Sequence, residues 1–302
     1  MMDLKKGRQK NKKGSEMIYK KYGQTFRALR RQRGLSLIYF ERIGISKSAL
    51  SMFETGKSML AFDKLNLALQ EMHVSLQFYG MLLNGREMDY FLIKFNEIDQ
   101  AYYNDNQIRL HNIYKELAES ADESLYDLSL AAKARVTLLT RAEKEELQTY
   151  FSKIKIWGRY ELLLFLNTLE QLEIGLVIKI SSDLISHPRQ YDYLHILPDF
   201  RVIFIRIIGM MIFRLCKLGK KEVAYAFFEK GQALLKESSA NMDVTNTVFL
   251  KFAEGYWIYT FEDRAKGNRL MKRVIRILAD LENYPLRNMF RHYHKLITQN
   301  KA

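Results

Sequence analysis

The 302-residue chain contains one cysteine, Cys216, and three prolines. A single cysteine cannot form an intrachain disulfide, and this fits a protein of the reducing cytoplasm. So few prolines argue against an all-β or linker-rich protein. The surrounding sequence, MIFRLCKLG, predicts that Cys216 is a small buried hydrophobe, with an intermolecular or redox role as the alternative.

The sequence also lacks a signal peptide and an uninterrupted apolar run. Its first sixteen residues are basic and polar, without the apolar core of a signal peptide. The segment 201–219 comes closest to a membrane span, but Arg201, Arg206 and Arg214 interrupt it, and each would be costly at mid-bilayer. We therefore expect a buried helix of a soluble α-protein, no membrane partner and a cytoplasmic location.

Catalytic and metal-binding patterns are missing as well. His292 and His294 do not have the i, i+4 spacing of a helical metal pair, and Cys216 has no second cysteine with which to bind zinc. No glycine-rich loop fits a phosphate cradle, and the acidic run over 143–146 is most simply a solvated helix start. The sequence predicts no enzyme, no metal and no cofactor.

Positive charge is present and unevenly placed. The net charge is +14, and residues 1–85 hold 16 Lys and Arg against 6 acidic residues. A basic end on a nearly balanced body suggests a polyanion partner for that end. Residues 1–16 have almost nothing to bury, which predicts a mobile basic arm that either adds phosphate contacts or is an idle terminus.

Helical patterns fill the rest of the chain. Over residues 17–85 we expect five short helices: Lys20–Arg33, a second capped by Ser36, 46–54 capped by Ser46 after a tight corner at Gly44, Asp63–Glu71, and a fifth capped by Ser75. Over 88–302, longer amphipathic segments with short polar breaks suggest a tetratricopeptide-like α-solenoid. The predicted fold is all-α, with a five-helix N-terminal domain followed by this repeat domain.

The stretch GISKSALSMFETGKSML, residues 44–60, matches the second half of a helix-turn-helix. A DNA major groove is about 12 Å wide, so a helix that enters it needs short or donor-bearing residues. We predict that base contacts come from Ser46, Lys47, Ser48 and Ser51. The alternative is an ordinary helical bundle whose Ser/Lys face only meets water.

Two segments support the DNA-binding reading. SALSMFETGKS, 48–58, contains the Ser-x-x-Glu-x-Gly-Lys run of the XRE (Cro/phage-repressor-like) family, and GQTFRALRRQRGLS, 23–36, resembles that family's opening helix. The resemblance implies that Glu54 orients the turn or pairs with a base such as Arg30. It implies phosphate contacts from Arg27, Arg30, Lys57 and Ser58. The chain departs from the family at Leu37, where Gln is usual, and at Met52, where Arg is frequent.

A narrower resemblance involves the larger part of the chain. WGRYELLLFLNTLEQL, 157–172, looks like the Trp-x-x-Tyr-Glu-x-x-Leu-Phe-x-Asn signature of the Rgg/GadR/MutR transcriptional regulators of Gram-positive bacteria, and residues 53–69 are similar to the same family. The resemblance implies a cytoplasmic homodimer that binds double-stranded DNA. The DNA site that this implies is a pseudo-palindromic operator. The resemblance further implies that many members sense a short imported hydrophobic peptide.

Candidate peptide contacts follow from this resemblance. Asn167 matches the family's asparagine, and a carboxamide can both donate to and accept from a peptide backbone. The other candidates are Glu170 and Tyr160 on the same helix face, and Asn246, Tyr256 and Arg206 on the opposite wall. The alternatives are a buried inter-helix hydrogen bond for Asn167, and solvated or core positions for Glu170 and Tyr160.

The sequence thus predicts a DNA-binding transcriptional regulator of the Rgg/MutR type whose homodimer forms through the helices of 242–298. Two N-terminal domains bound to half-sites about one DNA turn apart would multiply the sequence specificity of one short helix. The alternative is a helical-repeat scaffold for protein–protein interactions without sequence-specific DNA binding.

Overall fold

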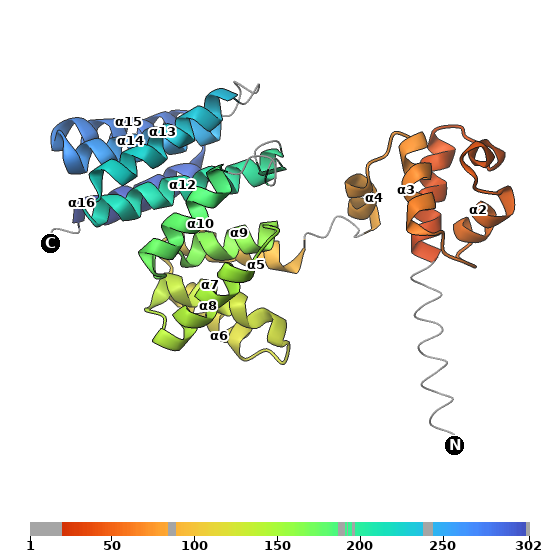
Figure 1. Ribbon diagram of the computed structural model, residues 1–302, viewed down its shortest axis with the longest axis horizontal. Helices are drawn as coiled ribbons and strands as arrows, with labels where there is room; N and C mark the ends of the chain where they lie inside the picture. The colour runs from red at the N-terminus through yellow and green to blue at the C-terminus, as the bar shows by residue number, and fades with distance from the viewer. Residues whose placement is uncertain are drawn as a thin grey trace, which may run out of the picture. The chain divides into compact units, whose positions relative to one another are not determined.

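The computed structural model describes residues 20–83, 89–186, 191, 193–194, 197–237 and 244–299. The chain divides into two compact units, Met1–Asp89 and Tyr90–Ala302, which are called the head and the repeat domain below. The described residues form helices joined by short turns, with no strand among them (Figure 1), so the predicted all-α fold is confirmed. The basic arm predicted over 1–16 lies outside the described residues.

Five short helical elements form the head, close to the predicted positions. They are a helix over 20–32, the 3-10 helix η1 (Ile38–Ile43), α2 (Lys47–Glu54), α3 (Phe62–Glu71) and α4 (Leu76–Leu83). The second element is a 3-10 helix and not the expected α-helix, which suits a short connector. The N-cap of η1 is Leu37 and not the predicted Ser36, which lies one residue earlier. The Ser36 Oγ accepts a hydrogen bond from the Tyr39 N–H at 3.2 Å.

A glycine corner and a small apolar core hold α2 in the head. Gly44 has φ 74°, a left-handed conformation that glycine adopts without a steric penalty, and it turns the chain between η1 and α2. The buried residues of this core include Ile45, Leu50, Phe53, Leu65 and Leu69. Leu35 and Leu37 pack against it and are partly buried.

Gly23 brings the first helix against the C-terminal end of α2. A Cβ atom added at Gly23 would lie 1.8 Å from the Phe53 carbonyl oxygen and 2.9 Å from the Glu54 Cα. Both of these are backbone atoms, which cannot rotate away as a side chain could. The close approach of the two helices therefore requires glycine here, and it fixes the position of α2.

The repeat domain is a chain of helices that pack on their neighbours. They are α5 (Tyr90–Tyr103), α6 (Gln107–Ala118), η2 (Glu123–Leu125), α7 (Tyr126–Val136), α8 (Arg141–Lys153), α9 (Arg159–Thr168), α10 (Ile174–Ser186), α12 (Pro198–Lys217), α13 (Lys221–Glu237), α14 (Val244–Phe261), α15 (Arg264–Asp280) and α16 (Tyr284–Gln299). Consecutive pairs such as α6 and α7, α12 and α13, and α14 and α15 contact each other, and so do α7 and α9, and α12 and α14. This stacking is typical of an α-solenoid.

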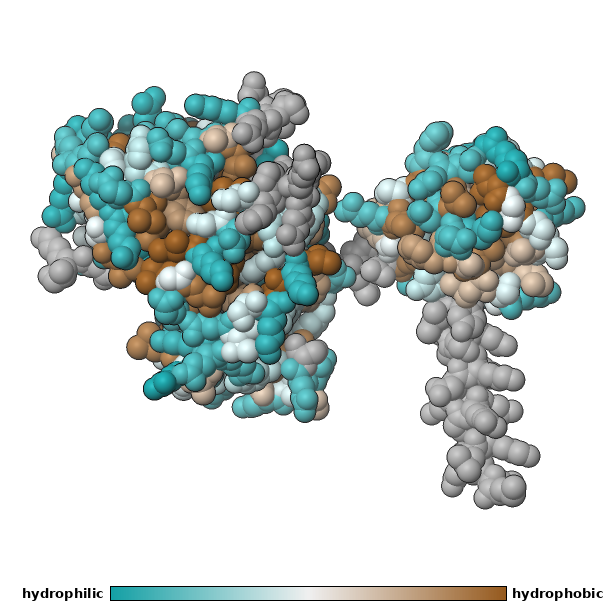
Figure 2. Space-filling view, in the orientation of Figure 1, coloured by the Kyte–Doolittle hydropathy of each residue, from teal (hydrophilic) through white to brown (hydrophobic). Residues whose placement is uncertain are grey.

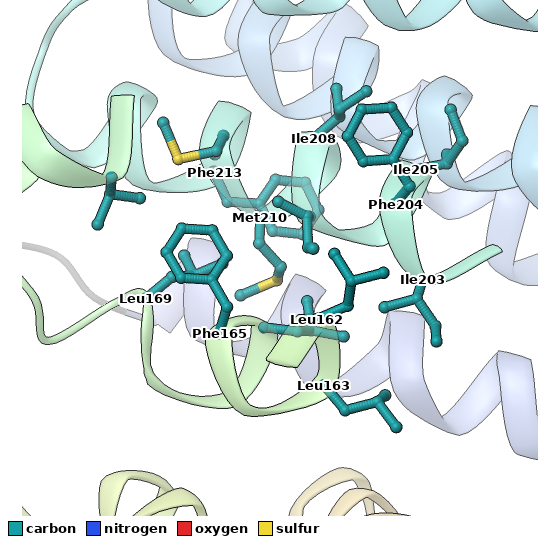
Figure 3. Packing of buried hydrophobic residues seen from close by; sticks show 14 of the residues in the cluster. Leu162, Leu163, Phe165, Leu169, Ile203, Phe204, Ile205, Ile208, Met210 and Phe213 are labelled. Carbon is teal, nitrogen blue, oxygen red and sulfur yellow. The ribbon is translucent and has the colours of Figure 1, made fainter. Parts of the chain in front are cut away.

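Helix α12 lies at the centre of the repeat-domain core. Figure 3 shows Phe165 and Leu162 of α9 pointing toward Met210 and Phe213 of α12, and all four side chains are buried. The apolar segment at 201–219 is thus a buried helix, as predicted. Among the helices that the structure describes, none is long and apolar enough to cross a bilayer. Cys216 is buried in the same core, and burial raises the pKa of its thiol to about 12.

The first and last helices of the repeat domain also meet. The Tyr103 and Tyr293 hydroxyl oxygens lie 3.1 Å apart. Just after α5, Asp105 lies 2.7 Å from His292 Nδ1 and accepts a hydrogen bond from Lys295 Nζ at 2.8 Å. The α5–α16 contact places residues near 100 beside residues near 290, and a pocket lies next to it.

Candidate DNA-reading helix and repeat-domain pocket

Helix α2 presents a polar face to solvent and an apolar face to the head core. Lys47 and Ser48 are exposed and Ser51 is half-buried, while Leu50 and Phe53 are fully buried. The hydroxyl-lined face is therefore turned away from the interior of the head, as DNA reading requires. The opposite face is held by packing, which keeps the exposed side chains in a fixed orientation.

Two side chains cap the N-terminus of α2. The Ser46 Oγ accepts a hydrogen bond from the Ala49 N–H at 3.2 Å, and the Glu41 Oε1 accepts one from the Lys47 N–H at 3.2 Å. Such caps typically stabilise a helix by about 1 kcal/mol. Ser46 is exposed, so its hydroxyl proton can still be donated to an acceptor in solvent.

The exposed face of α2 includes two residues that the sequence analysis did not assign to DNA. Met52 is 43% exposed, and Thr55 is exposed at the C-cap. The Thr55 hydroxyl donates to the Ser51 carbonyl at 2.8 Å, so its lone pairs remain available. Thr55 is four residues after Ser51, and that i, i+4 spacing is the signal that could have identified it.

Arg30 does not lie where the sequence analysis expected a phosphate contact. It is 7% exposed; its Nε lies 2.5 Å from Glu54 Oε1 and its Nη2 2.9 Å from Oε2. The hydrogen bond to Glu54 is the main reason why the pKa of Arg30 is raised. The structure does not offer Arg30 to a phosphate, because its guanidinium is buried and its Nε and Nη2 groups bind Glu54. The expectation that Glu54 pairs with Arg30 is confirmed.

The other predicted phosphate contacts are accessible. Lys57 is exposed and Ser58 is half-buried after α2. The Arg27 side chain is 41% exposed, and its Nε lies 3.9 Å from Glu54 Oε2. These three side chains are on the head surface and can move toward an anion.

Asn167 lies inside the repeat domain and not in an open groove. It is 2% exposed; its Oδ1 accepts a hydrogen bond from Arg135 Nε at 3.0 Å, and its Nδ2 donates to the Leu163 carbonyl at 2.9 Å. Arg135 is itself buried over the Tyr102 ring, 4.4 Å from its centroid. Asn167 thus satisfies a buried cation, which is the buried inter-helix hydrogen bond that the sequence left open as its alternative role. Its peptide contact stays a prediction.

Three further candidates for peptide contact are also separated from the pocket. Tyr160 is half-buried against the rings of Phe91 and Phe95, at centroid distances of 5.6 and 5.9 Å. Tyr256 is 6% exposed and packs on Phe213 in the core. Glu170 is half-buried, 3.7 Å from Lys217. Aromatic packing or an ion pair already engages these three side chains, so this arrangement gives their predicted peptide contacts no support, and they stay predictions.

The two remaining candidates, Arg206 and Asn246, come together at one pocket. The pocket has a volume of about 430 Å³ and lies between α5, α12, α14 and α16. Five carboxamide side chains line it, together with apolar residues such as Val202, Phe249 and Met289. The carboxamides are those of Asn96, Gln100, Asn104, Asn246 and Asn288.

A half-buried ion pair lines this pocket. The Arg206 Nη2 donates to Asp99 Oδ2 and to the Tyr103 hydroxyl, both at 2.8 Å. Burial acts to lower the pKa of Arg206, but the charge of Asp99, its hydrogen bond and the nearby hydroxyls of Tyr103 and Tyr293 together outweigh this effect, and the pKa is raised. Asp99 Oδ1 is buried and has no hydrogen-bond partner in the part of the chain that the structure describes. The pocket therefore offers an unused acceptor and not a free cation.

Comparison with known families decides what the two units are. A family model described as "HTH-type transcriptional regulator Rgg, C-terminal domain" matches residues 92–292, and a "Helix-turn-helix" model matches 26–85. The first match covers more than half of the chain. The chain belongs to the Rgg family of HTH-type transcriptional regulators. Both the α2 face and the pocket lie within the matched residues.

Solved structures share the fold of this Rgg-family chain. A putative transcriptional regulator from Listeria monocytogenes EGD-e has a TM-score of 0.74 at 17% identity, covering 94% of this chain and 99% of its own. The SHP pheromone receptor Rgg2 of Streptococcus dysgalactiae has a TM-score of 0.69 at 15% identity, covering 91% and 98%. PlcR of Bacillus thuringiensis, solved with the peptide PapR7 and DNA, has 0.58 at 14%, covering 93% and 100%.

In this Rgg-family chain only Arg206 and Asn246 of the pocket were predicted from the sequence as ligand contacts. Asp99 and Tyr103, which hold Arg206, were not singled out. They stand four residues apart on α5 and share one helix face, but their partner lies more than 100 residues later. Only the tertiary packing of α5 on α12 and α16 brings these groups together.

Proposed function

We propose that the chain is a homodimeric transcriptional regulator that binds double-stranded DNA through its two heads. The observation that carries this proposal is the exposed face of α2, with Lys47, Ser48 and Ser51 directed away from a rigid apolar core. Short donor-bearing side chains on a helix held in this way suit a major groove. Membership of a family of HTH-type regulators supports the same reading.

The homodimer is supported by the needs of DNA reading and by the exposed apolar side chains of the C-terminal helices. One α2 helix contacts only a few base pairs, and two heads on the half-sites of a pseudo-palindrome multiply the specificity. Ile277, Leu281 and Tyr284 are 42%, 62% and 51% exposed within the predicted dimer region of 242–298. Apolar groups of this size are typical of a surface that a second chain covers.

The test of DNA binding uses a duplex from the region upstream of the chain's own gene. We expect the full chain to shift this duplex as two chains per DNA. Ser48→Asp should lower the affinity about tenfold or more, because a carboxylate would face the electronegative groove. The control variant Gln77→Asp adds the same charge at an exposed position of α4 and should bind the duplex with normal affinity. A monomer at micromolar concentration, or equal affinities of the two variants, would contradict the proposal.

We further propose that a short hydrophobic peptide binds in the pocket between α5, α12, α14 and α16 and modulates DNA binding. An extended peptide presents amide groups about every 3.4 Å, and carboxamides can both donate to and accept from them. Apolar residues of the wall suit its side chains. The unused acceptor, Asp99 Oδ1, suits an N–H group of the peptide. The peptide complex of PlcR, a protein of similar fold, supports a peptide ligand.

Blocking the pocket tests this site. Val202 lines the pocket and is only partly buried, so Val202→Trp should fill the space without disturbing the core. The probes are synthetic peptides encoded by small open reading frames next to the gene, measured by fluorescence anisotropy. We expect Val202→Trp to weaken peptide binding about tenfold or more. The control is Val223→Trp, at an exposed position of α13 outside the pocket. Equal peptide affinities of the two variants would mean that the peptide binds elsewhere.

A further inference from the structure

Helix α15 has two opposite faces of different chemistry. Its buried side chains, including Met271, Val274 and Leu278, face the rest of the repeat domain. Its other face carries five basic residues, all exposed: Lys266, Arg269, Lys272, Arg273 and Arg276. At 3.6 residues per turn these five lie within about one third of the helix circumference. They are called the α15 basic stripe below.

The protein offsets only a small part of the charge of the stripe, through the charge interactions of Asp263 with Arg269 and Lys266. No ion pair links the five side chains to any residue that the structure describes. Two acids, Asp263 and Asp280, stand at the two ends of the helix, and none lies between them. Figure 2 shows hydrophilic side chains along the edge that α15 forms in Figure 1.

The stripe also differs in charge from the rest of its domain. Residues 264–299 contain nine Lys and Arg against two acidic residues, whereas residues 90–263 contain 21 against 24. The positive charge of the repeat domain is therefore concentrated in the last two helices. A local field of one sign attracts a partner of the opposite sign.

The composition of the stripe favours a nucleic-acid backbone over a protein or a lipid surface. Protein interfaces need an apolar centre from which charged residues are depleted, and a membrane-bound helix needs apolar residues that enter the lipid. The exposed apolar residues of this helix, Ile277 and Leu281, belong to the surface proposed above for the second chain. At 3.6 residues per turn they lie beside the stripe on the helix circumference and not within it. Phosphate binding, in contrast, requires only cationic side chains, which displace the counterions condensed on the DNA.

The dimensions of the stripe also fit DNA. From Lys266 to Arg276 the helix rises about 15 Å at 1.5 Å per residue. One strand of duplex DNA carries a phosphate about every 3.4 Å along the axis, so this length corresponds to about four phosphates. The five cations of the stripe are therefore enough to contact each of these phosphates.

We propose that the α15 basic stripe is a second DNA contact, which binds the phosphate backbone of the bound duplex without reading its sequence. This inference rests on the proposed DNA binding by the head. The head supplies sequence recognition, and the stripe adds affinity that depends on salt.

The experiment measures the affinity of the full chain for the upstream duplex at salt concentrations from 50 to 200 mM. The variant replaces four stripe residues, as K266Q, R269Q, R273Q and R276Q together. We expect the slope of log affinity against log salt to become shallower by about 3 to 4, close to 0.9 per lost contact. Affinity at 100 mM salt should fall about tenfold or more. The pairs R269Q/R273Q and K266Q/R276Q should each give about half of the change in slope, which guards against misfolding of the fourfold variant.

A matched control separates this effect from net charge. Four exposed lysines elsewhere in the repeat domain, Lys153, Lys179, Lys220 and Lys230, are replaced by Gln together. The control should change the slope by less than about one contact. Equal slopes for the stripe and control variants would overturn the inference. The proposed DNA binding by the head would be unaffected, and the α15 basic stripe would then face an acidic protein or only solvent. If the unaltered chain binds no upstream duplex, the proposed function fails, and the inference fails with it.

Discussion

Glu54→Ala is expected to destabilise the head strongly and to weaken DNA binding while the repeat domain keeps its stability. The variant leaves the Arg30 guanidinium buried without the carboxylate that it contacts at 2.5 and 2.9 Å. Removing one partner of a buried ion pair typically costs about 3–5 kcal/mol. Since small domains are stable by only about 5–15 kcal/mol, this loss is a large part of the stability of the head.

The two domains can be followed separately during unfolding. Both tryptophans of the chain, Trp157 and Trp257, lie in the repeat domain, so tryptophan fluorescence reports only that unit. Circular dichroism reports both. We expect Glu54→Ala to lower the temperature of the head transition seen by circular dichroism and to leave the fluorescence transition unchanged.

The matched control is Glu71→Ala. Glu71 pairs with Arg42, whose side chain is 53% exposed, and exposed ion pairs contribute about 0–1 kcal/mol. Its head should stay folded. If Glu54→Ala were as stable as this control, the buried pair would not be what holds the first helix to α2.

Asn167→Ala is expected to destabilise the repeat domain and not merely to remove a ligand contact. The change takes away the carboxamide oxygen that accepts from Arg135 Nε at 3.0 Å. Hydrogen bonds to charged groups contribute about 1.5–3 kcal/mol, and an unsatisfied buried donor adds a desolvation cost. Tryptophan fluorescence should show a lower unfolding midpoint in urea, because Trp157 lies beside α9.

Two further variants make this result specific. Asn167→Asp keeps an acceptor for Arg135 and should remain folded, with a stability closer to the unaltered chain than that of Asn167→Ala. Asn112→Ala, at an exposed position of α6, should stay within about 0.5 kcal/mol of the unaltered chain. Normal stability of Asn167→Ala with a lost peptide response would instead restore Asn167 to the ligand site.

The head could be predicted from the sequence in most of its detail because its signals are local. Gly44 marks a corner, Ser36 and Ser46 mark helix starts, and the i, i+3 spacing of Leu50 and Phe53 marks the buried face. Each of these signals depends on residues only a few positions apart. The 3-10 character of η1 was not predicted, because the same apolar stripe suits either kind of short helix.

The buried polar residues could not be predicted in the same way. Arg30 and Asn167 look like surface groups in the sequence, because polar residues are usually exposed. Their partners are Glu54, 24 residues away, and Arg135, 32 residues away. Only the packing of two helices decides whether such a group is satisfied inside the protein. For the same reason the pocket, which joins residues from 96 to 289, was found only through Arg206 and Asn246.

The bonds between α5 and α16 affect how the repeat domain can come apart. A linear helical array can fray from either end, one unit at a time. Here the terminal helix must first break its links to Tyr103 and Asp105, so loss of order at one end immediately loosens the other. A molecule bound next to the α5–α16 contact would stabilise or destabilise both ends of the array at once. Removing α16 from the chain would loosen the first helices of the array as well as the last.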